Sequence, residues 1–136
     1  DAVVVVDALA ARSSRRLNKT IQLADTGISP GSGVGNHRTE INSQTIGAKV
    51  IALGVPTVIS VPSIIDGSLD VIADTFNQSY GKKLMESFSE QQRYELAYHL
   101  AEPELADMFV TPKNIDELVK RISFTISEAI NSMIFT

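Results

Sequence analysis

Residues 3–12 read Val3-Val4-Val5-Val6-Asp7-Ala8-Leu9-Ala10-Ala11-Arg12. A continuous β-branched run of this kind predicts a strand that is buried on both faces, as strands of parallel sheets are. We expect this strand to end at Asp7. Because the carboxyl ends of parallel strands open onto the ligand crevice of α/β proteins, the Asp7 carboxylate is expected at the rim of a crevice, poorly solvated and positioned for proton transfer.

Asp7 also has a purely structural interpretation. An aspartate directly after a strand can cap a helix by accepting hydrogen bonds from the first N–H groups, here a helix over residues 8–17. The strand alone does not separate this interpretation from a catalytic one, and residues 8–18 are compatible with either a helix or a tight loop.

The rest of the chain alternates strand and helix patterns. Strands are predicted at residues 20–24 and 49–55, the second of them stopped by Pro56. A polar segment at residues 39–45 is weakly helical. Strand, crossover and strand in this order are typical of an α/β fold with parallel strands.

The second half of the chain is predicted to be helical. Residues 66–76 carry an apolar stripe at helical spacing, and Ser89 with Gln92 forms a capping box that starts a further helix. The clearest helical period covers residues 115–133. The polar residues 78–89 are expected to form an exposed connection.

Composition bounds the class of protein. The chain has 136 residues, 43% of them hydrophobic and 21% charged, which is ordinary for one soluble globular domain. It has no cysteine, so disulfides, thiolate chemistry and cysteine-bound zinc are excluded. A net charge of −4 argues against direct nucleic-acid binding, and no apolar run has membrane-spanning length. Because Asp1 immediately precedes a core strand, we expect residues 1–136 to be the C-terminal portion of a single domain whose N-terminal part is absent.

A glycine-rich loop follows the second predicted strand. Gly27-Ile28-Ser29-Pro30-Gly31 matches the serine-hydrolase pattern G-x-S-x-G, but Pro30 has no N–H to donate to an oxyanion, so this chemistry at Ser29 is disfavoured. A nucleotide site is weakly supported, because the glycine spacing does not fit a phosphate loop. Two interpretations stay open, a conformationally demanding loop and a loop whose amides line a cleft. The candidate cleft residues are Gly31, Ser32, Gly33 and Gly35.

Asp25 begins the triplet Asp25-Thr26-Gly27, which pepsin-like and retroviral aspartic proteases share. Those proteases are all-β, whereas this chain has parallel-strand and helix patterns, so membership of that class is disfavoured. We expect Asp25 to be a structural or supporting acid that bonds loop amides in an Asx turn.

A basic cluster follows the first strand. It consists of Arg12, Arg15, Arg16 and Lys19. Its simplest interpretation is a solvated basic face, and its functional interpretation is a pocket that pairs with acidic side chains of a substrate.

Several blocks together resemble one family, the germination protease of spore-forming bacteria. The likeness is dense over residues 1–58 and thinner beyond. The blocks are Val6-Asp7-Ala8-Leu9-Ala10-Ala11-Arg12, Asp25-Thr26-Gly27-Ile28, Pro30-Gly31-Ser32-Gly33-Val34-Gly35-Asn36, Gly54-Val55-Pro56-Thr57-Val58 and Val110-Thr111-Pro112-Lys113. The chain departs from the family after Val58, and its segment between Phe76 and Met108 is shorter than the family leads us to expect.

The resemblance implies a function. It implies an endopeptidase of the spore core that degrades small acid-soluble spore proteins during germination, is made as a zymogen, assembles as a homotetramer and needs no cofactor or metal. It also implies a three-layer α/β sandwich around a mixed, mainly parallel sheet, similar to hydrogenase-maturation endopeptidases.

The resemblance also assigns the catalytic residues. By motif position Asp7 is one catalytic carboxylate, and the second belongs to an upstream segment that this chain lacks, so the chain alone is expected to be inactive. Family substrates are cleaved beside a glutamate, which gives the basic cluster a role in charge pairing.

Two other functions stay open. A metal held between Asp7 and another carboxylate or His37 would make a metal-dependent peptidase. A non-catalytic fragment would serve assembly through its apolar C-terminal helix, with Ile122 and Ile126 at the contact.

Overall fold

A computed structural model describes residues 1–76 and 80–135. Its sheet contains β1 (Ala2–Ala11), β2 (Gln22–Ala24) and β3 (Lys49–Ser60) in the order β1-β3-β2, with β4 (Phe109–Val110) pairing to the end of β3. β1 and β3 are parallel, whereas β2 and β4 are antiparallel to β3. The prediction of a mixed sheet in an α/β fold is confirmed, and the prediction that it is mainly parallel is wrong for the described residues.

The first strand does not end at Asp7. β1 continues to Ala11, and residues 8–11 pair with β3 between Val55 and Ile59. Because alanine and leucine fit the pleated surface here, pairing with β3 overrides their helical propensity. No helix covers residues 8–17; the chain turns after Ala11, and Asp7 lies inside the strand instead of at its end.

Pro56 does not stop β3, contrary to the prediction. The register shifts beside it, because Leu9 pairs with Pro56 whereas Ala10 pairs with Val58. Proline lacks the N–H that a regular ladder uses, and such an irregularity tolerates it. The Pro56 carbonyl accepts a hydrogen bond from the backbone N–H of Asn18 at 2.7 Å, so the other side of β3 stays bonded here.

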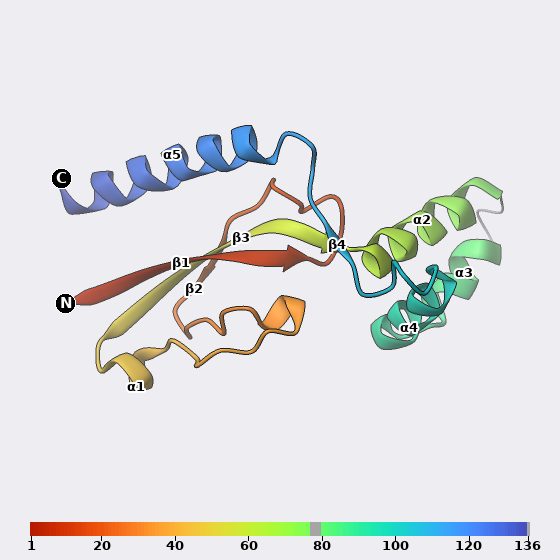
Figure 1. Ribbon diagram of the computed structural model, residues 1–136, viewed down its shortest axis with the longest axis horizontal. Helices are drawn as coiled ribbons and strands as arrows, with labels where there is room; N and C mark the ends of the chain where they lie inside the picture. The colour runs from red at the N-terminus through yellow and green to blue at the C-terminus, as the bar shows by residue number, and fades with distance from the viewer. Residues whose placement is uncertain (77–79, 136) are drawn as a thin grey trace.

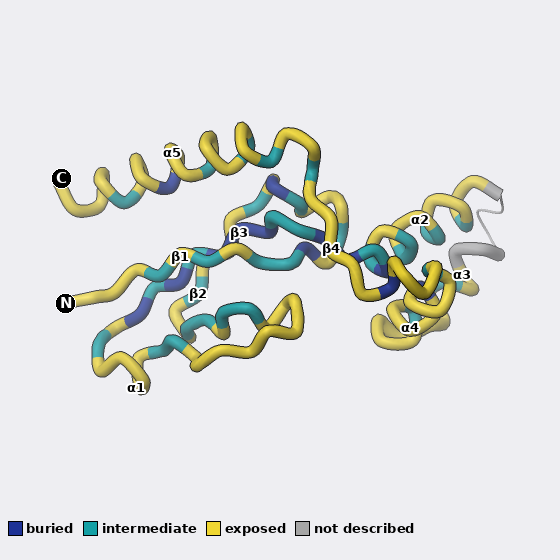
Figure 2. The backbone as a smooth tube through the Cα atoms, viewed as in Figure 1, coloured by how far each residue is buried: buried dark blue, intermediate teal, exposed yellow. Residues whose placement is uncertain are grey.

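The core lies along β3, whose Val50, Ala52 and Ile59 are buried (Figure 2). β1 is an edge strand of the described sheet, and Val3, Val4 and Val6 are 36%, 40% and 52% exposed. The expected burial of this run on both faces is therefore not found in the described residues. The pattern is that of an interior strand, but in this sheet β1 has a neighbour on one side only.

The helices are unevenly distributed around the sheet. In Figure 1, α5 (Ile115–Ile134) runs along one side of β1 and β3, while the segment with the short helices η1 (Ser32–Val34) and α1 (Ser43–Ile46) lies on the other. The helices that the chain forms between β3 and β4 lie beyond the end of the sheet. Helical segments thus lie on both sides of the described sheet, those on one side being short, and the three-layer sandwich stays a prediction.

The bounds of the three outer helices are α2 (Val61–Phe76), α3 (Tyr80–Glu86) and α4 (Glu90–Leu100). The predicted capping box is confirmed: the Ser89 hydroxyl accepts from the Gln92 N–H at 3.2 Å, and the Gln92 side chain accepts from the Ser89 N–H at 2.9 Å. The expected exposed connection at residues 78–89 contains α3, and its first two residues lie outside the described range. No helix in the described ranges is long and apolar enough to cross a membrane.

Candidate functional site

Asp7 carries an unusual carboxylate. It pairs with Gly54 across the parallel strands and is half-buried, and its Oδ2 is fully covered yet has no hydrogen-bond partner among the described residues. A Cβ at Gly54 would collide with Cδ1 of Leu9, so the Leu9 side chain packs where Gly54 has none. A covered acceptor without a donor is destabilising by about 1–3 kcal/mol, and a catalytic role is one physical reason for a protein to keep such a group.

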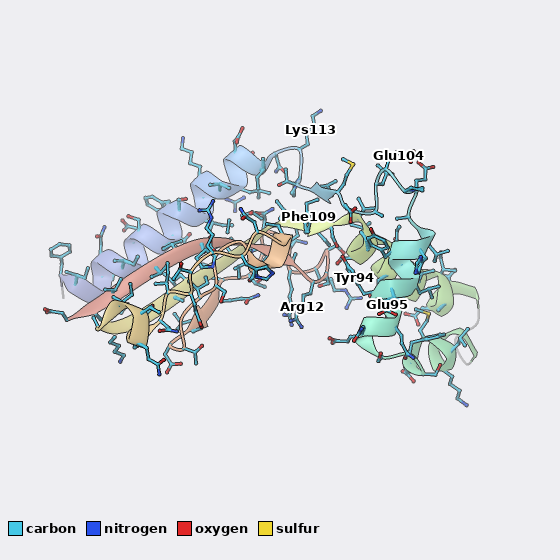
Figure 3. The ribbon with its side chains drawn as sticks, turned by 60° about the horizontal axis from the view of Figure 1, so that its bottom comes forward. Arg12, Tyr94, Glu95, Glu104, Phe109 and Lys113 are labelled. Carbon is cyan, nitrogen blue, oxygen red and sulfur yellow. The ribbon has the colours of Figure 1, made fainter. Side chains whose placement is uncertain are left out.

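A cavity of about 830 Å³ lies where β1 and β3 both end. Ala10 and Ala11 line it from the end of β1, and Arg12 lines it from the turn that follows. Ser60 lines it from the end of β3, and Ser63 from the first turn of α2. The outer helices and β4 complete it with Asp66, Asp70, Met85, Glu86, Phe88, Glu90, Gln91, Arg93, Tyr94 and Phe109. Figure 3 shows Arg12, Tyr94 and Phe109 in this region. A crevice outside the carboxyl ends of parallel strands is where α/β folds bind ligands.

Arg93 joins two of the helices that form the cavity. Its Nε donates to Asp66 Oδ1 at 2.8 Å, and its second guanidinium nitrogen lies 2.7 Å from Asp70 Oδ2. Two side-chain hydrogen bonds raise the pKa of Arg93, and the bond to Asp70 has a larger effect than the bond to Asp66. Because Asp66 and Asp70 are one turn apart on α2, a single guanidinium reaches both and ties α4 to α2.

Arg12 forms a weaker contact across the mouth of the cavity. One guanidinium nitrogen lies 3.9 Å from a carboxylate oxygen of Glu90, and both side chains are almost fully exposed. Such exposed pairs contribute little to stability. Arg12 is therefore free to exchange Glu90 for another partner.

Comparison with known sequences assigns the family. Residues 1–87 match the family described as germination protease. The chain belongs to the germination protease family.

Relatives at 35–41% identity support the assignment. The germination protease of Caldanaerobacter subterraneus subsp. tengcongensis is 41% identical over 136 residues, which cover 96% of this chain and 42% of that protein. One from Clostridium perfringens is 40% identical with the same coverage, and one from Bacillus cereus is 35% identical over 168 residues, covering 97% of this chain and 46% of that protein. The chain spans about two fifths of the length of the first two relatives. The third alignment is longer than this chain, so that relative has residues inserted relative to it.

Within this chain, the predicted site residues do not gather in one place. Arg12 and Gly33 line the cavity, whereas Asp7 does not. Asp7 precedes Ala10 on the same strand by about 10 Å at the usual rise per residue. Arg15 and Arg16 are exposed and do not line it.

Asp25 is exposed and forms no hydrogen bond or ion pair with a described residue, so the expected Asx turn is not formed.

The glycine-rich loop is conformationally demanding, as one of the two interpretations held. Gly31 and Gly35 have φ values of 76° and 74°, which favour glycine, and the Asn36 N–H donates to the Gly31 carbonyl at 2.9 Å. Gly33 lies against β1, because a Cβ there would sit 3.1 Å from that of Ala10. Among the four predicted cleft residues, Gly33 lines the cavity, and Gly31, Ser32 and Gly35 lie outside it.

Sequence reasoning missed Asp66, Asp70 and Arg93. The two aspartates carried a detectable signal, since a spacing of four residues places them on one helical face. Arg93 is 27 residues from Asp66 and gave none.

The metal-dependent alternative has no ligand set in the described part of the chain. His37 is exposed, and the described residues contain no group of three or more histidine, aspartate or glutamate side chains placed to hold an ion.

Proposed function

We propose that these residues belong to an endopeptidase of the spore core that starts the degradation of small acid-soluble spore proteins during germination. Membership of the germination protease family and the similarity to relatives of that name support the peptidase role. The orphaned Oδ2 of Asp7 is the observation that carries the mechanism. The fold relationship to hydrogenase-maturation endopeptidases, the zymogen form and the homotetramer belong to the same proposal.

In the proposed mechanism, ionised Asp7 removes a proton from a water molecule as the water oxygen attacks the scissile carbonyl carbon. A second, protonated aspartate polarises the carbonyl oxygen. The tetrahedral intermediate then collapses: the leaving nitrogen takes the proton that Asp7 removed from the water, the C–N bond breaks, and the proton on the former carbonyl oxygen returns to the second aspartate. The second acid is supplied by residues outside this chain, and we expect the isolated chain to be inactive.

The cavity supports a peptide-binding role further along β1 than Asp7. It lies along the direction of β1, and it combines aromatic side chains with charged groups, which together can hold and orient a ligand. An extended substrate with its scissile bond at Asp7 reaches the cavity within a few residues, because strands rise about 3.3 Å per residue.

Asp7→Asn in the whole protein tests the mechanism. Loss of a general base is expected to reduce cleavage of a spore protein roughly 10²–10⁴-fold, while circular dichroism stays unchanged. Asp25→Asn is the matched control, because Asp25 is exposed and unpaired among the described residues. Retained turnover in correctly folded Asp7→Asn protein would remove Asp7 from catalysis.

A further inference from the structure

The cavity at the ends of β1 and β3 has an excess of negative charge. Its walls carry the carboxylates of Asp66, Asp70, Glu86 and Glu90. They carry two guanidinium groups, those of Arg12 and Arg93, which leaves two net negative charges. A concave site with apolar walls focuses such a field and attracts a ligand of the opposite sign.

The ion pairs inside the cavity leave several carboxylate oxygens without a partner among the described residues. Arg93 bonds one oxygen of Asp66 and one oxygen of Asp70. The other oxygen of each carboxylate is not buried and accepts no hydrogen bond from the described residues. Glu86 forms no ion pair with any described residue. Three carboxylates therefore retain free oxygens on the cavity wall.

Aromatic side chains line the same cavity. They are Tyr94 of α4, Phe109 of β4 and Phe88, which lies between α3 and α4. Figure 3 labels Tyr94 and Phe109. The face of an aromatic ring attracts an ammonium or guanidinium group, and its apolar surface packs against the methylene stem of lysine or arginine. Free carboxylate oxygens beside aromatic rings thus match a long cationic side chain.

We propose that this cavity binds a lysine or arginine side chain of an extended peptide. The position of that residue rests on the proposed function: with the scissile bond at Asp7, the cavity receives a side chain about three residues away, since Asp7 and Ala10 are three positions apart. The inference differs from the expectation that the basic cluster selects acidic side chains. Only Arg12 of that cluster lines the cavity, and Glu90 lies beside it.

Two short capped peptides test the charge preference directly. They share the same apolar residues and differ at one position, lysine in one and glutamate in the other, and their Kd values for the whole protein are measured by calorimetry at low salt. The lysine peptide is expected to bind about tenfold more tightly, the ratio that one charge-assisted hydrogen bond supplies. The ratio of the two Kd values is expected to fall towards one as the salt concentration rises, because salt screens the charges.

Variants locate the binding site. Asp70→Asn and Glu86→Gln are expected to weaken the lysine peptide several-fold, whereas Asp74→Asn leaves its Kd unchanged. Asp74 is the matched control, since it is exposed one turn further along α2 and lies outside the cavity. Glu86→Gln keeps the test valid if Asp70→Asn loosens α2 from α4, because Glu86 pairs with neither helix.

Equal or tighter binding of the glutamate peptide would overturn the proposal, as would no binding of either peptide. An equal loss in Asp74→Asn would also overturn it, since the effect would then be general electrostatics. Binding is separable from catalysis: Asp7→Asn retains the lysine preference if the cavity is the site, whether or not cleavage is lost.

Discussion

At the scale of single residues, glycine conformation was predictable and the environment of Asp7 was not. The glycine-rich loop signals positive φ by composition alone, and Gly31 and Gly35 adopt it. The end of β1 was misplaced because residues 8–11 carry helical and strand propensity together, and only pairing with β3 decides between them. The covered oxygen of Asp7 and the packing of Leu9 against Gly54 both depend on the pairing of β1 with β3, which no local pattern encodes.

Gly31 and Gly35 provide a matched pair of substitutions. Alanine at either position is strained by about 1–2 kcal/mol because φ is positive. At Gly31 the new Cβ also collides with the backbone oxygen of Asn36, whereas at Gly35 it meets nothing within 4 Å. Gly31→Ala is therefore expected to lower the free energy of unfolding more than Gly35→Ala, measured by urea denaturation. Equal losses would show that the collision relaxes freely.

At the scale of elements, the sequence predicted α4 and α5 well, because caps and helical periods are local signals. It missed the extent of β3, since Pro56 is tolerated only through the register shift beside it. The packing of α2 against α4 was not predicted either, because it depends on ion pairs between Arg93 and the distant residues Asp66 and Asp70.

Arg93→Met tests how much these ion pairs between α2 and α4 contribute to stability. The substitution removes both ion pairs of a mostly buried guanidinium and is expected to lower the free energy of unfolding by about 1–2 kcal/mol. The raised pKa of Arg93 means that its contribution is complete below the ordinary arginine value and is lost only as pH rises through the raised one. The destabilisation should thus be the same at neutral and mildly alkaline pH. Arg121→Met on α5 is the control, and an equal effect there would contradict the account.

The hypothesis of a non-catalytic assembly role assigned the contact between subunits to Ile122 and Ile126 of α5. Ile126 faces the sheet in this structure. Ile126 is 9% exposed and lines a cavity together with Val6, whereas Ile122 is half-buried, so the assembly role stays a prediction. Ile126→Ala is expected to lower the free energy of unfolding by about 2–4 kcal/mol. Phe124, which is 68% exposed, is the control, and its alanine variant should unfold normally. Loss of an oligomer without loss of stability in Ile126→Ala would favour the assembly role instead.

At the scale of the whole molecule, the family was recognisable from the sequence, and the directions of the strands were not. The motif blocks of residues 1–58 fall within the matched range 1–87, and they identify the family without the fold. The expectation of a mainly parallel sheet came from the resemblance, whereas the described residues form one parallel pair of strands and two antiparallel ones. The cavity arises where β1 and β3 end beside α2, so it requires the tertiary arrangement.

The two-acid mechanism makes a geometric claim about the whole protein. In a crystal structure of the full-length protein, the decisive measurement is the distance from either carboxylate oxygen of Asp7 to the nearest other carboxylate oxygen. The account predicts a second acid at about 3 Å, close enough to share a proton or to hold one water with Asp7. An Asp7 carboxylate covered only by apolar side chains, with no other acid in reach, would contradict it.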